Sequence, residues 1–432
     1  MRKLVLCLYL ILFSSIVFAQ LSDKQHTKAL KFIKDEALPI NLDSGKTFLK
    51  DINKLKKYIG NSSIVLLGEE THGDGTAFKT KAELVKLLHK ELGFSVIALE
   101  SSMFLAEKSF EKAQKQQDGK LTIRSSSSPI WTWSIEVQPL VNYIDQQKNS
   151  SNPLYLTGFD YNEFSQMDRE TFPIELLKAM NKNHISFLNK EEQNSFLIFY
   201  ALLANQFSER TEQMSVDYLK SLLKTFNVAG YRILGELRLL KGTDIELLAQ
   251  NLINKLNVSN NLVNKELKET NSKFNEYLRD SIMAANIIWL KEKRYPNQKI
   301  IVWAANLHNA KKVGAPYRRL MGDFLYEKYP KEIYSIAFVA NKGEIGNFTW
   351  DGNRELSPAT PNMLEHLFSS TNIDNFLLDF KTLKGTRKGK WLDSEQTMRP
   401  FGYIEQTKNW TNIFDAIIFN DQMEKVHIFK TN

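Results

Sequence analysis

One segment, residues 64–101, constrains the fold of this chain more than any other. The apolar run 64–67 is followed by a glycine-rich turn, an amphipathic pattern at 78–92 and a second apolar run, 96–99. The apolar steps of the middle pattern predict a helix that ends at Gly93. A strand, a helix and a strand at this spacing predict a parallel unit with a right-handed crossover, and we expect its two strands to be neighbours.

The rest of the chain adds strand-like runs and one long helical region. Residues of about 169–293 show helical periodicity and few glycines. Short apolar runs without polar interruption are typical of strands covered on both faces. Five more such runs predict buried strands at 154–157, 300–304, 333–339, 376–378 and 416–419. We therefore expect an α/β fold with a mostly parallel central sheet flanked by helices, and a large helical insertion that caps the strand ends.

The N-terminus has the pattern of a secretory signal peptide, residues 1–19. Two basic residues precede an apolar run, and small residues stand before the expected cleavage site after Ala19. An uncleaved membrane anchor is the alternative, although the run is short for a span. The only cysteine, Cys7, lies in this segment, so residues 20–432 offer no thiol for a disulfide, a metal site or a nucleophile. We expect one mature domain, 20–432, that is periplasmic or secreted.

Charge and hydropathy limit the partners of the chain. The formal net charge is +8, but the lysines are scattered along helical patterns together with glutamates. No arginine-rich block alternates with aromatic residues, so we expect no nucleic-acid partner. No second apolar run reaches spanning length, so we expect no stable membrane insertion after signal cleavage. A small molecule is the expected partner.

Ionisable residues follow the first two predicted strands. His72 lies in the turn after run 64–67, with Glu69 three residues before it, and Glu100 ends the second run. The carboxyl ends of parallel strands form the edge where ligands bind in open α/β sheets. A histidine flanked by carboxylates is suited to proton transfer near neutral pH. The alternatives are a cap or surface carboxylate for Glu69 and a buried ion pair for Glu100.

The next two predicted strands repeat the pattern. Asp160 follows the third strand, and Asn306 and His308 follow the fourth. Asp160 alone is equally well explained as the N-cap of a helix. Four strand ends that all carry polar groups are harder to explain one by one, so we expect these residues to share a cleft.

Two further residues are candidates for substrate binding. Arg279 lies on a predicted helix and would orient a substrate or stabilise an oxyanion, unless it is a solvated arginine paired with Glu276. Trp133, with Trp131 close by, would line an apolar pocket, although core packing is the commoner use of tryptophan.

Several motifs are missing from the sequence. There is no G-x-S-x-G elbow of a serine hydrolase and no H-E-x-x-H metal motif. The glycine-rich turn matches neither a phosphate-binding loop nor a dinucleotide fingerprint. We expect no cofactor and no metal.

The motifs that carry these residues resemble the successive motifs of the erythromycin esterase family, over about residues 54–419. They are GEETHG around His72, ALES around Glu100, LTGFD at Asp160, RDSIMAAN at Arg279 and VWAANLHN at His308. The resemblance implies an α/β core with helical additions, a deep cleft, and hydrolysis of the macrolactone ester of 14-membered macrolides without a serine nucleophile. It implies that His72 is the general base that activates water, that Glu69 and Glu100 support it, and that His308 completes the site.

The chain departs from the family pattern at two places. Ala305 stands where the family usually has the first of two histidines, and Lys79 or Lys81 stands where it usually has an arginine. A lysine keeps the charge but loses bidentate geometry. These departures leave two alternatives open. One is a metal-dependent hydrolase, in which the imidazoles and carboxylates of the site hold a divalent ion. The other is a non-catalytic envelope protein associated with glycans.

Overall fold

The structure is a computed structural model. It describes residues 23–43, 46–127, 129–163, 165–205, 214–263, 272–314, 319–346 and 353–429. The expected signal peptide lies outside these residues. Across the described ranges, no helix combines the length and the apolar character needed to cross a membrane.

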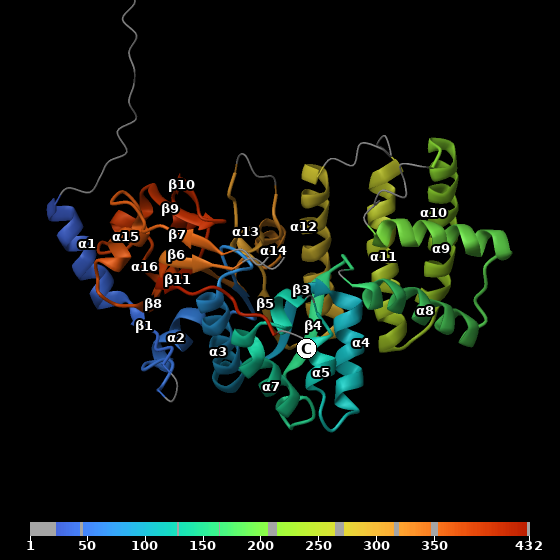
Figure 1. Ribbon diagram of the computed structural model, residues 1–432, viewed down its shortest axis with the longest axis horizontal. Helices are drawn as coiled ribbons and strands as arrows, with labels where there is room; N and C mark the ends of the chain where they lie inside the picture. Colours follow the sequence, from blue (N-terminus) through green and yellow to red (C-terminus); the bar gives the residue numbers. More distant parts are fainter. Residues whose placement is uncertain are drawn as a thin grey trace, which may run out of the picture.

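A mixed sheet forms the centre of the molecule (Figure 1). Its order in the described chain is β1-β8-β11-β6-β2-β5-β3-β4, and β7 pairs with β6. Neighbouring strands from β4 to β11 run parallel, whereas β1, β7 and β8 join in antiparallel pairs. The strands are β1 (Leu38–Pro39), β2 (Ile64–Leu67), β3 (Phe94–Ser102), β4 (Tyr155–Asp160), β5 (Lys299–Trp303), β6 (Ile333–Ile345), β7 (Arg354–Leu356), β8 (Asn375–Asp379) and β11 (Ala416–Met423).

The seven apolar runs of the sequence all contribute strands to this sheet, and the expected mostly parallel α/β fold is confirmed. One expectation was wrong: β2 and β3 are not neighbours, because β5 lies between them and pairs with both. Strand β5 can lie between two other strands because its side chains are apolar on both faces of the sheet. Ile300 and Val302 pack into one core cluster, and Ile301 and Trp303 pack into the other.

Helices cover both faces of the sheet. On one face α3 and α7 pack over β2, β3 and β5, and on the other face α12 and α14 do so. Helix α3 ends at Gly93, which adopts a left-handed φ of 72°, as the sequence predicted. Helices outside the insertion are α1 (Asp23–Glu36), α2 (Ile52–Ile59), α3 (Gly75–Leu92), α4 (Met103–Gln114), α5 (Lys120–Arg124), α6 (Pro129–Thr132), α7 (Gln138–Gln147), α13 (Asn306–Asn309), α14 (Met321–Lys328), α15 (Leu364–Ser369) and α16 (Phe380–Leu383).

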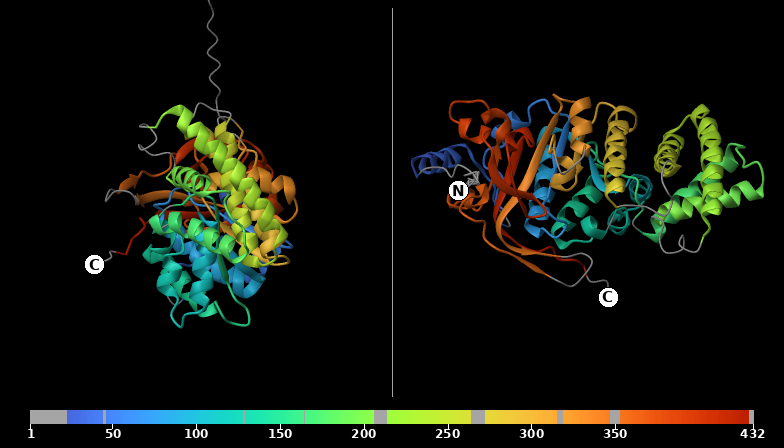
Figure 2. Two further views of the ribbon diagram at one scale, coloured as in Figure 1. Left: turned by 90° about the vertical axis from the view of Figure 1, so that its right-hand side faces the viewer. Right: turned by 90° about the horizontal axis from the view of Figure 1, so that it is seen from above.

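In the described part of the region between β4 and β5, the chain forms five α-helices. They are α8 (Gln166–Lys182), α9 (Lys190–Ala204), α10 (Val216–Leu239), α11 (Thr243–Val263) and α12 (Ser272–Trp289). Helices α8 to α11 form a lobe at one end of the molecule, and α12 stands between this lobe and the sheet (Figures 1 and 2). The start of α9 is capped by Asn189 and the start of α10 by Ser215, whose side chains accept backbone N–H groups. Phe196 and Phe226 stack 4.7 Å apart in the lobe core.

A small hairpin lies beside the sheet. Strands β9 (Gln396–Phe401) and β10 (Ile404–Lys408) are joined by the two-residue turn Gly402–Tyr403. The remaining short elements are the 3₁₀ turns Ile135–Val137, Lys390–Asp393 and Trp410–Asn412, and the π-helical turn Leu290–Arg294.

Candidate active site

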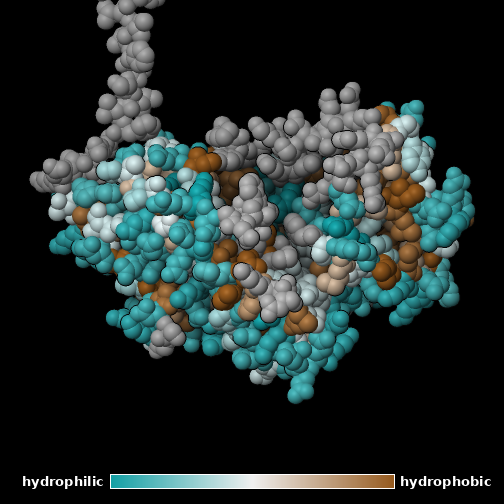
Figure 3. Space-filling view, in the orientation of Figure 1, coloured by the Kyte–Doolittle hydropathy of each residue, from teal (hydrophilic) through white to brown (hydrophobic). Residues whose placement is uncertain are grey.

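The carboxyl ends of four parallel strands bring the predicted ionisable residues together. Glu69 follows β2, Glu100 lies near the end of β3, Asp160 ends β4 and His308 lies on α13 just after β5. Because β5 stands between β2 and β3, His308 comes within contact distance of Glu100. In the space-filling view the surface is hollowed between the sheet and the helical lobe (Figure 3).

The turn 69–74, which we call the His72 turn, holds His72. His72 Nδ1 lies 3.4 Å from Glu69 Oε1, and the His72 side chain is 40% exposed whereas that of Glu69 is fully buried. The ring of Trp131 packs edge-to-face on the imidazole at a centroid distance of 4.9 Å. His72 is therefore held in one place but remains open to a substrate and to water.

Burial alone would lower the pKa of His72. The contact with Glu69 and the negative charge of Glu100 outweigh burial, and the pKa lies above its usual 6.5. The imidazole is thus a stronger base than free histidine, and the carboxylates stabilise the imidazolium that forms when it takes a proton.

Lys81 is a site residue that the sequence pointed to only as the counterpart of a family arginine. Its buried ammonium group donates to Glu69 Oε2 and lies 4.2 Å from the centre of the Trp303 ring. Burial lowers the pKa of Lys81 to about 8, although Glu69 opposes this shift. The missed signal is its spacing: Lys81 lies three residues after Phe78 and four before Val85, on the apolar face of α3.

Glu100 is a buried carboxylate that is surrounded by donors. Its Oε1 accepts from Arg279 Nη2 at 2.7 Å and lies 3.5 Å from His308 Nε2, and its Oε2 accepts from the backbone N–H of Ala305 at 3.2 Å. Burial would raise the pKa of Glu100, but His308 and Arg279 lower it to about 2. Glu100 is therefore ionised at any physiological pH.

Arg279 links two strand ends. It donates from Nε and Nη2 to Asp160 Oδ2, at 2.9 and 2.6 Å, and from Nη2 to Glu100. Asp160 is fully buried, and Arg279 keeps only about a fifth of its side chain exposed. The alternative partner Glu276 has a side chain outside the described residues. Arg279 thus presents a positive charge beside His308 Nε2, which lies 3.3 Å from Nη1.

His308 is held as a cation. Its Nδ1 pairs with Asp280 Oδ1 at 2.8 Å, and the same oxygen accepts the backbone N–H of Met321 at 2.9 Å. Burial works against the charge, but Asp280 and Glu100 raise the pKa of His308 to about 9. This imidazole therefore carries a proton at neutral pH and is suited to stabilising negative charge.

Two predicted substrate-binding residues have other surroundings. The amide of Asn306 is fully buried and bonds the backbone of Phe338 and Pro400, so it joins α13 to β6 and β9. The backbone carbonyl of Trp133 accepts from the N–H of Phe429. The tryptophan against the His72 ring is Trp131, whose indole donates to the carbonyl of Glu100.

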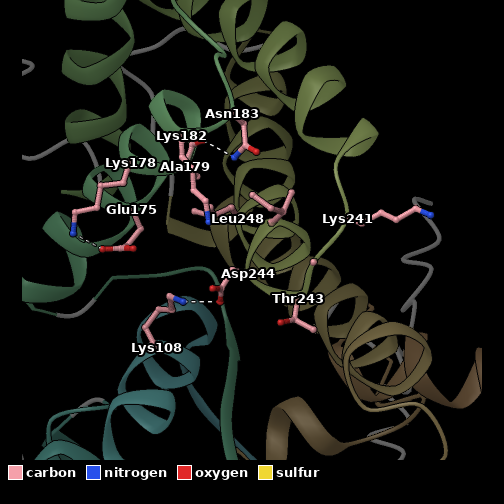
Figure 4. Close-up of a pocket in the computed structure, with 12 residues that line it drawn as sticks. Lys108, Glu175, Lys178, Ala179, Lys182, Asn183, Lys241, Thr243, Asp244 and Leu248 are labelled. Atoms are coloured by element: carbon pink, nitrogen blue, oxygen red, sulfur yellow. Dashed lines mark hydrogen bonds and ion pairs between the residues drawn. The ribbon is translucent and has the colours of Figure 1, made fainter. Parts of the chain in front are cut away.

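A pocket of about 440 Å³ lies elsewhere, between α4, α8 and the start of α11 (Figure 4). None of the eight predicted site residues lines it. Lys178 pairs there with Glu175 at 2.9 Å, and Lys108 pairs with Asp244 at 2.7 Å. Lys178 and Asp244 are largely exposed, so these pairs are solvated and contribute little.

The charges of the site are balanced by protein groups. Glu69 is bound by Lys81, while Glu100 and Asp160 are bound by Arg279. Within the described ranges, no three His, Asp, Glu or Cys side chains are arranged so that they could hold a metal ion.

Comparisons with known proteins agree with this architecture. The chain is 28% identical to "Putative hydrolase YbfO" of Bacillus subtilis (strain 168), over 99% of this chain and 97% of that protein. Among solved structures, a succinoglycan biosynthesis protein has a TM-score of 0.75 at 20% identity and covers 94% of this chain and 100% of its own. A mutant of the erythromycin esterase EreC in its open conformation has a TM-score of 0.67 at 18% identity, over 90% of this chain and 98% of that one. These two likenesses concern the fold.

The sequence pattern described as erythromycin esterase matches residues 89–423. The match includes Glu100, Asp160, Arg279 and His308, and it begins after His72. Because this pattern covers most of the chain, the protein belongs to the erythromycin esterase family.

Proposed function

We propose that this protein is a hydrolase that cleaves a carboxylic ester or lactone with water activated by His72. The observation that carries the proposal is the contrast in one site between a partly exposed basic imidazole, His72, and a buried cationic imidazole, His308. An ester hydrolysis needs both functions, because water must lose a proton while the carbonyl oxygen gains negative charge.

In the proposed reaction, His72 takes a proton from water as the water oxygen attacks the ester carbonyl. Glu69 holds the imidazole and stabilises its positive charge, in the role that a carboxylate has in a catalytic triad. The oxyanion forms near the protonated His308 and the guanidinium of Arg279, which Asp280 and Glu100 already hold in place, so that no reorganisation is needed. Collapse of the tetrahedral intermediate breaks the bond between the carbonyl carbon and the ester oxygen. The alkoxide leaves with the proton from His72, and the products are an acid and an alcohol.

The family supports a macrolide lactone as the substrate, and the hydrolase relative from Bacillus subtilis supports hydrolysis more generally. Ala305 stands where the family usually has a histidine, so the substrates to test include other lactones and simpler esters beside macrolides. The basic and apolar N-terminal segment supports an exported enzyme, and an N-terminus other than Gln20 on the exported protein would count against it.

The alternative is hydrolysis that depends on a divalent ion held by the same imidazoles and carboxylates. We favour the metal-free reaction because protein cations already occupy the three carboxylates at the strand ends. The two reactions respond differently to a chelator, since only the metal-dependent one requires the ion.

The test is mass spectrometry of erythromycin and of simpler lactones and esters after incubation with the mature protein. We expect a product heavier by one water, formed equally after chelator treatment and absent with His72→Ala. Loss of the product after chelation would favour the metal-dependent reaction. Failure to hydrolyse any member of the panel, or a His72→Ala variant that is as active as the parent, would refute the proposal.

A further inference from the structure

A second group of buried ionisable residues lies behind the His72 turn. It consists of Glu70 and Asp74 from the turn, Glu365 from α15, Arg399 from β9 and Tyr403 from the β9–β10 turn, and we call it the acid cluster. The three carboxyl groups are buried, and the proposed reaction uses none of them. The cluster adjoins the site, because the Asp74 charge acts on Lys81.

Several polar atoms of the cluster lack hydrogen bonds. Both carboxyl oxygens of Glu70, one oxygen of Glu365 and Nε of Arg399 are buried without a hydrogen bond among the described residues, and the buried hydroxyl of Tyr403 lies close to Glu70 and Asp74 without the geometry of a hydrogen bond. Buried polar groups are normally bonded, so five unbonded atoms in one cluster require an explanation. Arg399 does not neutralise the acids through its Nη2 group, which donates to the backbone carbonyls of Asn341 and Ser357.

The cluster holds more acids than it can ionise together. The groups that act on Glu70 are Asp74 from its own turn, Glu365 from α15, and Tyr403 and Arg399 from the hairpin. Arg399 is the cation of this set, and Lys81, which also binds Glu69, acts on Asp74 from the site side, so three carboxyl groups exceed the positive charge beside them. Burial, with the charges of Asp74 and Glu365, raises the pKa of Glu70 well above its usual range. Burial also raises the pKa of Asp74 to about 6 and that of Glu365 to about 7.

Asp74 is the acid that must stay charged. Its two oxygens accept hydrogen bonds from the N–H and the hydroxyl of Thr71, at 2.9 and 2.6 Å. These bonds close the turn around His72, and hydrogen bonds to a carboxylate favour its ionised form. A negative charge on Glu70 as well would repel the Asp74 carboxylate and weaken its hydrogen bonds to Thr71.

Tyr403 has an unusual backbone for its residue type. Gly402 and Tyr403 both have left-handed φ values, 66° and 62°, as the central residues of a two-residue hairpin turn often do. That conformation favours glycine or asparagine over a bulky residue. The strain is accompanied by burial of the Tyr403 hydroxyl towards Glu70 and Asp74, and the N–H of Gly402 donates to the carbonyl of Glu70 at 3.2 Å.

We propose that Glu70 keeps a proton at neutral pH, enclosed by Asp74, Glu365 and Tyr403, and that this neutral acid positions the His72 turn. The proton removes one negative charge, so Asp74 remains ionised and continues to hold Thr71, and His72 stays in place. When the proton is lost at high pH, two neighbouring buried carboxylates repel each other and the turn loosens. Glu70 and Tyr403 are positioning residues, and only their effect on catalysis rests on the proposed function.

The first test needs no substrate. Infrared spectroscopy of the full-length mature protein at pH 7 should show the carbonyl band of a protonated carboxylic acid, and Glu70→Gln should weaken it. Glu107→Gln is the matched control, because Glu107 is also buried but is bound by Arg294 and Tyr295. A band that is absent from the parent, or that Glu70→Gln leaves unchanged, would refute the protonated state.

The second test compares variants by activity and pH profile. Glu70→Gln mimics the neutral acid and should keep kcat while extending activity to higher pH. Glu70→Ala should lower kcat roughly ten- to a hundredfold with little change in KM, because the turn is misplaced. Tyr403→Phe should also lower kcat, as Glu70→Ala does, because it removes the hydroxyl that lies towards Glu70 and Asp74. Equal losses in Glu70→Gln and Glu70→Ala would refute the positioning role, whereas an inactive parent with an intact infrared result would refute only the proposed function.

Discussion

The two histidines of the site differ in how the protein holds them. His72 lies in a turn, with 40% of its side chain exposed and its nearest carboxylate oxygen 3.4 Å away. His308 lies on α13 with 15% of its side chain exposed and an Asp280 oxygen at 2.8 Å. The pKa of both imidazoles lies above its usual value, and that of His308 is raised to about 9.

This difference shows how one residue type supplies two functions. Burial opposes the charge on His308, but the close carboxylates of Asp280 and Glu100 outweigh it and keep His308 protonated at neutral pH. A looser carboxylate contact leaves His72 able to gain and lose a proton, which a general base must do in each turnover. Variants that change His72 and variants that change the charge of His308 should therefore alter different parts of the pH profile of activity.

The largest expected effect is that of His72→Asn. Removing a general base costs about 10²- to 10⁴-fold in kcat, and the rise of activity with pH that tracks the pKa of His72 should disappear. The measurement is the pH dependence of kcat/KM for the substrate that the panel identifies.

The control for this variant is His427→Asn. His427 is about half exposed and also pairs with a carboxylate, Glu136, at 2.7 Å, but it is not at the strand ends that form the site. It should leave kcat unchanged. A similar loss of kcat in both variants would contradict the role of His72 as the base. So would a His72→Asn enzyme whose activity still rises with pH as that of the parent does.

Much of the fold follows from local pattern. Buried strands such as β2 and β5 were predictable because both of their faces are apolar, and α3 was predictable from its spacing and Gly93. The order of the strands was not, because β5 enters between β2 and β3 from more than 200 residues away in the sequence. Such pairing depends on contacts that a local pattern does not contain.

The candidate site also combines features that follow from local sequence with features that depend on distant contacts. The polar residues at strand ends were predictable from their position, but their partners were not. Asn306 was expected at the substrate, whereas its amide bonds the backbone of β6 and β9. Lys81 was hard to assign because its burial depends on Glu69 and Trp303, which belong to other elements.

An intermediate effect is expected for Asp280→Asn, which makes His308 more like His72. Asparagine keeps an acceptor for His308 Nδ1 and Met321 N but removes the charge, so the pKa of His308 should fall from about 9 towards 6.5. The alkaline limb of kcat/KM should move down by roughly one pH unit or more, which lowers the protonated fraction of His308 at pH 8, and with it the activity, at least about twofold. Glu136→Gln is the control, and an unmoved limb would contradict the assignment.

The same variant has a predicted effect on stability. A folded-state pKa above the unfolded value of 6.5 means that the His308 contribution is fully present below pH 6.5 and is lost as pH rises through about 9. Urea unfolding of the parent should show this decline, and Asp280→Asn should flatten it. A parent stability that does not fall between these pH values would contradict the charged state of His308.

The smallest effect is expected for Trp131→Phe, which loosens the packing of His72. Phenylalanine keeps an aromatic ring near the imidazole but loses the indole hydrogen bond to the carbonyl of Glu100. Trp410→Phe is a matched control, because Trp410 is equally buried and donates its indole N–H to the carbonyl of Gln396, away from the site.

Both variants should lose about 1–3 kcal/mol of unfolding free energy from the lost bond and the altered packing. Only Trp131→Phe should also lower kcat, by a few-fold, because misplacement of the base affects the transition state directly. Equal kcat in the two variants would mean that Trp131 stabilises the fold without positioning His72.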